Sequence, residues 1–295
     1  THAWPSQAAV HAGMKNVLNA IPDNWPMALH LSEGALHAIQ THSSYLGYKV
    51  LRGMAGKKIL NPMTDKDIIY TGHYIDHELV SNIDEDCKNR VQRVKEGKPM
   101  RFLLTVGGAG AQGDFFIAII KSLLPYIKEN KASLFVNVGD HKNVWEDFEK
   151  KIPELKEFSK SGLCKTHFED FEEVKDFVNK LTSNEKADNG NGIHIFYDSD
   201  IFSAVYSTNL LMRFSDVLIT KPSELAFYPI PKLHIKRVGG HEMWGAIHSA
   251  EVGDGTYECE TVESTVGMIN EFLSNPRLLE KMCNNIVEAK KAGIY

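Results

Sequence analysis

The sequence predicts an α/β protein built on a doubly wound parallel sheet. Apolar strands alternate with helical stretches over about 200 residues from position 101 onward, which is the pattern of such sheets. An apolar strand at 101–106 runs directly into a glycine-rich turn at 107–113. The helix after this turn carries its apolar residues on one stripe at helical spacing, so it is expected to pack on the sheet.

The other elements of this region follow in chain order. Apolar runs predict strands at 133–139, 192–198, 216–220 and 232–236. The stretches between and after them predict helices at 142–151, 171–181, 203–213 and 242–251. The polar run 183–192 is expected to be a surface loop. Two terminal helices are expected at 262–273 and 276–291, the second begun by Pro276.

The pattern of the first part of the chain predicts the later strands of another α/β domain, and this domain is expected to be incomplete in the chain. Short apolar runs at 16–24, 35–42 and 67–72 are each followed by polar or glycine residues, as parallel strands often are. The stretch 43–54 is a candidate helix between two of these strands.

A charged stretch at 82–100 predicts an exposed helix that ends at Gly97, just before Pro99. We expect a domain boundary at this stop signal. It divides the chain into an N-terminal part at 1–98 and a second domain at 99–275. The alternative is an ordinary interior helix followed by a loop.

Composition narrows the class of protein. The 295 residues are 43% hydrophobic with a formal net charge of −5, so no global positive field favours nucleic acid. No apolar run approaches the roughly 18–20 residues of a membrane span, so no transmembrane segment is predicted. The four cysteines are scattered without a CxxC pair, which predicts neither a zinc site nor a disulfide framework. A cytoplasmic location is expected, and because the chain begins at Thr1 we expect an upstream segment to be missing.

The turn "VGGAGAQG" is the first candidate binding feature. Glycines let the backbone approach a ligand closely, and the helix that follows offers unpaired N–H groups and the positive end of its dipole. That combination suits a diphosphate. The turn is neither a P-loop nor a true GxGxxG motif, and no acidic residue ends the next strand before Asp140. A tight turn with small residues for packing is the alternative.

The second candidate is the segment that follows strand 216–220. Lys221, Pro222, Ser223 and Glu224 come directly after it, and Pro222 suits the first turn of a short helix. A carboxylate at the carboxyl end of a parallel strand lies in the crevice where ligands bind, so Glu224 could accept hydrogen bonds from both ribose hydroxyls. The alternative is a carboxylate that only complements the helix dipole.

Two histidine patterns point away from metal chemistry. His241 and Glu242 begin a helix, but Gly245 stands where a zinc-protease motif needs its second histidine. His73 and His77 are four residues apart, and no third ligand can be nominated. The sequence therefore predicts no metal site.

Three segments together resemble the GT-B nucleotide-sugar glycosyltransferases. "GGAGAQG", "PSELAFYPIPKL" and "HEMWGAIHSAEVGDGT" match, in that order, motifs of their C-terminal domains, and the matching region covers about 101–256. The likeness is closest to the peptidoglycan N-acetylglucosaminyltransferase and the diacylglycerol galactosyl- and glucosyltransferases. It implies two Rossmann-like domains that face a cleft, with the last helix, within 276–295, crossing back to the N-terminal domain.

The resemblance also implies roles for residues. The glycine turn would hold the donor diphosphate, Glu224 the ribose, His241 and Glu242 the donor sugar, and segment 209–213 would lie near the base. The donor-binding residues implied in this way are Gly107, Gly108, Ala109, Gly110, Ala111, Gln112, Met212, Arg213, Lys221, Ser223, Glu224, His241 and Glu242. Two departures from the family pattern bear on the donor: Lys221-Pro222 replaces a glycine-rich turn, and His-Glu replaces an Asp/Gln-Gln pair.

The implied activity is transfer of a sugar from a nucleoside diphospho-sugar, expected to be a UDP-sugar, to an unidentified acceptor such as a lipid or glycan. No cofactor and no metal are expected, and association with a membrane surface stays open. Strand ends in the N-terminal part offer candidate general bases for the acceptor: His2, Asp23 and His42. Each has a purely structural alternative. A nucleotide-sugar epimerase and a non-catalytic nucleotide-sugar-binding protein are the competing functions.

Overall fold

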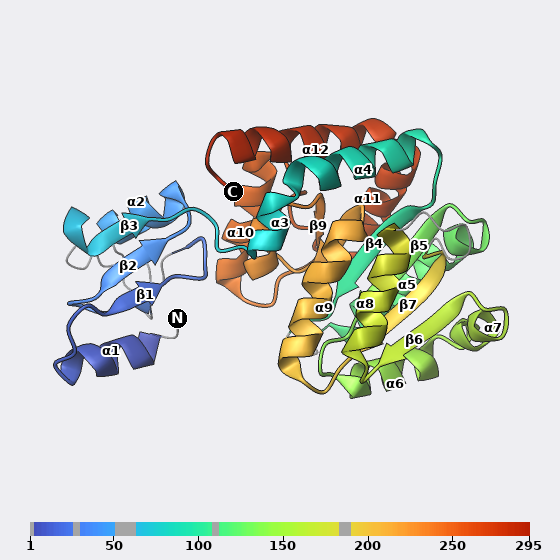
Figure 1. Ribbon diagram of the computed structural model, residues 1–295, viewed down its shortest axis with the longest axis horizontal. Coiled ribbons are helices and arrows are strands. Elements are labelled where there is room, and N and C mark those ends of the chain that lie inside the picture. Colours follow the sequence, from blue (N-terminus) through green and yellow to red (C-terminus); the bar gives the residue numbers. More distant parts are fainter. Residues whose placement is uncertain (1–2, 26–29, 51–62, 108–111, 183–189) are drawn as a thin grey trace.

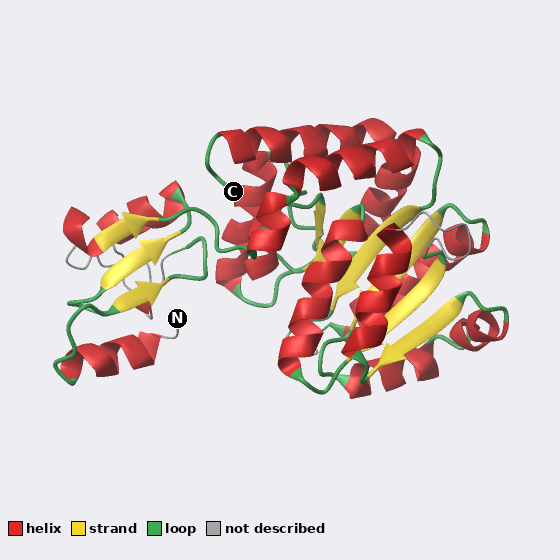
Figure 2. Ribbon diagram, in the orientation of Figure 1, coloured by secondary structure: helices red, strands yellow, loops and turns green. Residues whose placement is uncertain are grey.

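The protein folds into two α/β units joined by one extended segment (Figure 1). The computed structural model describes residues 3–25, 30–50, 63–107, 112–182 and 190–295. Every strand pairing within the two sheets is parallel, and helices lie on both sides of the larger sheet (Figures 1 and 2). The predicted α/β class with parallel sheets is confirmed.

The N-terminal unit contains a small parallel sheet with strand order β1-β2-β3. Its elements are α1 (Ala3–His11), β1 (Leu18–Ala20), β2 (Leu36–Ile39), α2 (His42–Val50), the 3-10 turn η2 (Asp65–Asp67) and β3 (Ile68–Tyr70). All three predicted strands of this part are confirmed. The sequence analysis did not predict α1, because its residues form no apolar stripe and Trp4 is 68% exposed.

One face of this small sheet is apolar and exposed. Leu18 pairs with Leu36, and the neighbouring strand adds Ile69, so the three side chains share a face. They are 58%, 36% and 45% exposed. The opposite face buries Ile39 and Ile68 against α2.

The second unit is a six-stranded parallel sheet with strand order β6-β7-β5-β4-β8-β9. The strands are β4 (Met100–Thr105), β5 (Ala132–Asn137), β6 (Cys164–Phe168), β7 (Gly192–Tyr197), β8 (Val217–Thr220) and β9 (Lys232–His234). The helices and 3-10 turns of this unit are α5 (Gly113–Lys128), α6 (Lys142–Lys151), α7 (Glu154–Lys160), α8 (Phe171–Thr182), α9 (Ile201–Phe214), η3 (Glu224–Phe227), η4 (Gly240–Glu242), α10 (Met243–Val252), α11 (Val262–Ser274) and α12 (Pro276–Lys291).

The core of this unit is divided by the sheet. Strand β4 is buried along its whole length, with alternate side chains on opposite faces. Phe102 and Leu104 pack with residues of α5, α11 and α12, whereas Leu103 packs with residues of α8 and α9. Since β4 pairs with β5 on one side and with β8 on the other, successive strands are added in opposite directions from it. That reversal opens a crevice at the carboxyl ends of β4 and β8.

All strands and helices predicted after residue 100 are confirmed, and two further elements were missed. These are α7 and β6, in the stretch 152–171. β6 lies at the edge of the sheet, and its central residues Lys165 and Thr166 are exposed. A half-exposed edge strand lacks the continuous apolar run by which the inner strands were identified.

Helix α4 (Ile83–Lys95), with the short α3 (His77–Ser81) before it, packs on the second unit. Arg90 is buried and donates hydrogen bonds to the carbonyls of Ser215 (2.8 Å) and Met212 (2.9 Å). Ile83 also belongs to the main core. By its contacts α4 therefore lies with the six-stranded unit, N-terminal to the boundary expected at residue 98, and the connection between the units runs through Thr71–Asp76.

The last helix, α12, lies alongside α4 (Figure 1). Lys290 forms an ion pair with Asp84 at 2.5 Å, and the residues after the helix reach the connecting segment. The carbonyl of Ile294 accepts a hydrogen bond from the N–H of His73 at 3.4 Å. α12 thus contacts residues numbered below 98, but these residues are α4 and the connection, not the three-stranded sheet.

A polar cluster ties the connection to the second unit, with His73 and His248 half-buried. Nε2 of His73 lies 2.9 Å from Nε2 of His248 in α10, and Nδ1 of His73 lies 2.9 Å from the carbonyl of Phe227. Next to them, the buried Lys232 forms an ion pair with Asp254 at 2.7 Å. Burial lowers the pKa of His73 to about 3 and the pKa of His248 to about 4.

These two histidines should make the fold sensitive to acid. In the unfolded chain each binds a proton near its ordinary pKa of about 6.5, whereas in the folded protein both stay neutral until about pH 4. Their effect on stability is therefore absent above pH 6.5 and grows as the pH falls toward 4. The free energy of unfolding should decrease by on the order of 1 kcal/mol per pH unit for each histidine.

Urea unfolding at several pH values between 7.5 and about 4.5 tests this effect. His248→Asn should give a flatter dependence on pH than the wild type. His11→Asn, which changes an exposed histidine of α1, should keep the wild-type slope. Equal slopes for His248→Asn and the wild type would contradict the assignment.

Candidate functional site

A cleft of about 770 Å³ opens at the carboxyl ends of β4, β5 and β8. Loops after all three strands line it, together with the beginnings of α9 and η3. The lining residues that carry polar side chains are Thr105, Gln112, Asn137, Asp140, His141, Thr208, Asn209, Thr220, Lys221, Ser223, Glu224, Tyr228, His241 and Glu242. This is the crevice that the reversal of strand order creates, and it is the usual ligand site of such sheets.

The floor of the cleft is the junction of β4 and β8. Thr105 donates a side-chain hydrogen bond to Thr220 across the two strands at 3.0 Å. Directly above, a Cβ atom at Gly107 would lie only 2.8 Å from Cε of Lys221. A side chain at position 107 would therefore make the end of Lys221 shift, so glycine lets the lysine extend close to the backbone at this position.

The ammonium of Lys221 donates to the carboxylate of Glu242. The carboxylate of Glu242 is buried and also accepts hydrogen bonds from the backbone N–H groups of Val238 (2.7 Å) and Gly239 (3.0 Å). Burial acts to raise its pKa, but the bonds from Lys221 and from the two N–H groups outweigh burial and hold the pKa of Glu242 below its ordinary value. Glu242 is therefore an ionised anchor for both Lys221 and the 238–242 turn.

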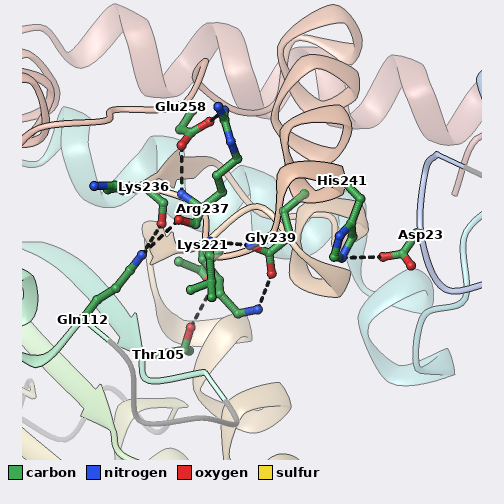
Figure 3. Close-up of polar contacts among 12 residues, drawn as sticks. Asp23, Thr105, Gln112, Lys221, Lys236, Arg237, Gly239, His241 and Glu258 are labelled. Carbon is green, nitrogen blue, oxygen red and sulfur yellow. Dashed lines mark hydrogen bonds and ion pairs between the residues drawn. The ribbon is translucent and has the colours of Figure 1, made fainter. Parts of the chain in front are cut away.

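Gln112 joins the glycine turn to the same loop. Its backbone is left-handed, with φ of 73°, and it precedes the first residue of α5. Its side-chain amide donates to the carbonyls of Lys236 at 2.7 Å and Arg237 at 3.3 Å (Figure 3). The amino end of α5 is thereby fixed against the far wall of the cleft. The predicted residues Gly108, Ala109, Gly110 and Ala111 lie outside the described residues.

Ser223 and Glu224 line the cleft at the start of η3, as the position of their segment after β8 requires. Glu224 is exposed, so its carboxylate is open to a ligand. Lys221 is the one lysine or arginine among the described residues that line the cleft. Asp140, Glu224 and Glu242 supply negative charge around it, so an anionic group would be attracted only close to Lys221 and the amino end of α5.

The N-terminal unit contacts the second unit beside this cleft. Oδ1 of Asp23, in the loop after β1, lies 3.7 Å from Nε2 of His241 (Figure 3). Asn24 donates its side-chain amide to the carbonyl of Trp244 at 2.8 Å, and the rings of Trp25 and Trp244 stack at 4.4 Å. The candidate base Asp23 is thus brought to the edge of the donor-side residues.

Several predicted site residues lie elsewhere. Met212 is buried and Arg213 pairs with Asp86 at 3.2 Å, so neither lines the cleft. A helix that follows a parallel strand begins at the cleft edge of the sheet and ends at the opposite edge, so of the segment 209–213, expected near the base, Asn209 is the described residue that lines the cleft. The first turns of α9 line the cleft instead. His42 stacks on Tyr70 within the N-terminal unit, and His2 lies outside the described residues.

Residues at the end of β5 and in the loop after it also belong to the cleft, and they were not predicted as site residues. Asn137 is buried and donates to Thr208 at 2.7 Å, and Asp140 and His141 line the cleft. Their signal was the position of this segment at the end of a predicted inner strand, which places them at the same sheet edge as the glycine turn. Among the described residues no group of three or more His, Cys, Asp or Glu could hold a metal ion. No helix in the described ranges is long and apolar enough to cross a membrane.

Two family models match the chain. The model described as domain of unknown function DUF6938 matches residues 63–295, and the one described as domain of unknown function DUF6937 matches residues 1–50. Comparison with curated protein sequences gives no match.

Comparison with solved structures finds the same fold. The UDP-GlcNAc 2-epimerase of Neisseria meningitidis bound to UDP-GlcNAc has a TM-score of 0.55 at 13% identity, covering 99% of this chain and 72% of that one. The S. aureus MnaA–UDP co-structure has a TM-score of 0.52 at 12% identity, covering 98% and 71%. A Listeria monocytogenes structure has a TM-score of 0.52 at 14% identity, covering 96% and 66%. The chain thus spans about two thirds of the length of that protein. The GT-B-like arrangement of two Rossmann-like units is confirmed.

Glu242→Gln tests the anchor in the cleft. Glutamine keeps the shape of the side chain but removes its negative charge. That charge holds Lys221 and strengthens the hydrogen bonds from the two backbone N–H groups. The free energy of unfolding should fall by about 1–3 kcal/mol, measured by urea denaturation at neutral pH. Glu251→Gln, at an exposed position of α10, is the matched control and should leave stability unchanged. If both variants are as stable as the wild type, Glu242 is not the anchor described.

Proposed function

The chain belongs to the DUF6938 family, and we propose that it binds a nucleoside diphospho-sugar in the cleft beside β4 and β8 and transfers the sugar to an acceptor. The observation that carries the proposal is the close approach of the Lys221 side chain to Gly107, the first glycine of the turn. A single cationic side chain extends beneath Gly107, next to the amino end of α5. A diphosphate is the group that this combination suits best.

The same arrangement supplies the chemistry of the leaving group. When the bond between the sugar and the diphosphate breaks, negative charge increases on the diphosphate oxygens. The first N–H groups of α5 and the ammonium of Lys221 are held in place before the reaction, so they can stabilise that charge without reorganising. Glu242 keeps Lys221 in position through one carboxylate oxygen while the other binds the 238–242 turn.

The nucleoside then lies toward η3. Glu224 begins this turn at the carboxyl end of β8 and is exposed to the cleft. An ionised carboxylate only accepts hydrogen bonds, which suits the two hydroxyl groups of a ribose. The Neisseria structure was solved with UDP-GlcNAc and the S. aureus structure with UDP, so UDP-GlcNAc is the first donor to test. The acceptor is proposed to be a lipid or glycan.

Epimerisation of the nucleotide sugar is the second candidate. It is favoured by His241 and Glu242, which line one side of the cleft with Asp23 behind His241, because an epimerase needs acidic and basic groups around the sugar. Incubation with UDP-GlcNAc and no acceptor separates the two by NMR. A new stereoisomer of the donor indicates epimerisation, release of UDP indicates transfer to water, and binding without either indicates a non-catalytic protein.

Lys221→Met tests the diphosphate site. Methionine fills similar space without the charge, so UDP affinity should fall about tenfold or more, while the affinity for uridine, which carries no phosphate, stays the same. Isothermal titration calorimetry measures both. Lys121→Met, on an exposed position of α5, is the control for loss of one positive charge. Unchanged UDP affinity in Lys221→Met would place the diphosphate elsewhere.

Glu224→Gln tests the ribose site. Loss of a charged acceptor for two hydroxyls costs about 1.5–3 kcal/mol, so UDP should bind roughly tenfold to a hundredfold more weakly. The preference for UDP over dUDP should also disappear. If the variant binds UDP normally but fails to turn the donor over, Glu224 acts in the reaction and not in ribose recognition.

A further inference from the structure

His241 lies where the two units and the cleft meet. It lines the donor cleft, and its Nε2 faces Asp23 of the N-terminal unit at 3.7 Å. Asp23 itself is not a lining residue, so it stands behind the imidazole as seen from the cleft (Figure 3). Its second oxygen lies 3.8 Å from Nδ1 of His30.

The other side of the His241 ring faces Gly239. A Cβ atom at position 239 would lie 2.5 Å from Cε1 and 2.9 Å from Nδ1 of His241. Gly239 also lines the cleft. The absence of a side chain at position 239 therefore lets the ring pack against the backbone there, while Nε2 is directed to the carboxylate of Asp23 and the side chain of His241 remains 34% exposed.

We propose that His241 is the general base that accepts the proton of the acceptor, and that Asp23 is the residue that positions it from the other unit. This rests on the proposed transfer function. A proton on Nε2 directed to Asp23 leaves the lone pair on Nδ1, and His241 lines the cleft, so Nδ1 is the ring nitrogen that we assign as proton acceptor. Contacts of this kind are often long in the unliganded protein and shorten when substrate binds, so 3.7 Å is compatible with the role.

The reaction then proceeds in one displacement. The acceptor O–H bond breaks and its proton moves to Nδ1 of His241. The acceptor oxygen forms a bond to the anomeric carbon of the donor sugar. The bond from that carbon to the diphosphate oxygen breaks, and the electron pair leaves with the nucleoside diphosphate. The resulting imidazolium is stabilised by Asp23 and returns its proton to solvent.

The surroundings of Asp23 indicate the chemical class of the acceptor. Burial raises the pKa of Asp23, His241 and His30 act to lower it, and Glu224 and Glu242 act to raise it. Carboxylates from η3 and η4 thus act on this position, and a further negative charge would be repelled. The half-buried rings of Trp25 and Trp244 stack beside it, and such faces suit the C–H groups of a sugar ring. The acceptor is therefore an uncharged carbohydrate hydroxyl.

The experiment measures UDP release from UDP-GlcNAc, UDP-glucose and UDP-galactose, with water or methyl glycosides as acceptors. Asp23→Asn and His241→Gly should each lower kcat by about 10²–10⁴-fold, while the Kd for UDP changes less than threefold. Added imidazole should restore part of the activity of His241→Gly. Asp23→Glu should retain more activity than Asp23→Asn.

Asp65→Asn, which alters an exposed aspartate of η2 in the same unit, is the matched control and should behave as the wild type. Gly239→Ala should lower kcat, because its methyl group would displace the His241 ring from its place between Gly239 and Asp23. Wild-type kcat in His241→Gly or Asp23→Asn, or better use of sugar phosphates than of methyl glycosides, would overturn this inference and leave the proposed function standing. No UDP release by the wild type from any donor would overturn the proposed function and this inference with it.

Discussion

The architecture of the second unit depends on the position of β4 in its sheet. β4 is the first strand of the unit along the chain, yet it lies in the interior, with β5 on one side and β8 on the other. Parallel strands require crossover connections, so the loops that leave β4 and β8 must turn away from each other to reach opposite faces. The space between those loops is the cleft. Gly107 and Lys221 lie close together there because each follows shortly after the end of one of these neighbouring strands. Their proximity is a consequence of the sheet topology and not of an attraction between the two residues.

Among the described residues, two groups of contacts link the connection and the N-terminal unit to the second unit, and they differ in how deeply their residues are buried. On one side of the connection, the half-buried His73 and His248 lie next to the buried Lys232–Asp254 ion pair. Beside the cleft, the loop Asp23–Trp25 meets η4 and α10 through one hydrogen bond, one ring stack and one longer ion pair. A contact that includes a buried ion pair costs more to open than one made of partly exposed groups. We therefore expect the contacts beside the cleft to separate before the polar cluster does.

Much of the fold could be predicted from the sequence, and the reasons for the failures are specific. Inner strands such as β4 and β8 are continuous apolar runs, so hydrophobic patterning finds them; β6, with Lys165 and Thr166 exposed, is not such a run. The segments after β4 and β8 were identified as site candidates because strand ends converge at one sheet edge, and the structure brings Gly107, Lys221, Glu224 and His241 to one cleft. Met212 and Arg213 lie in the last turns of α9, away from the cleft, whereas Asn209 of the same segment lines it. The approach of Asp23 to His241 joins residues far apart in the chain and on different units, and local pattern carries no signal for it.

The narrow connection between the units has a consequence for how such proteins diversify. In the described part of the chain the backbone passes from one unit to the other once, at Thr71–Asp76, and the helices on either side pack within their own units apart from α3 and α4, which follow the connection. The N-terminal unit could therefore be replaced by recombination. The replacement would have to supply a residue like His73 at the polar cluster and a short loop that contacts Trp244. Selection could then change the sequence of one unit without requiring changes in the packing of the other unit.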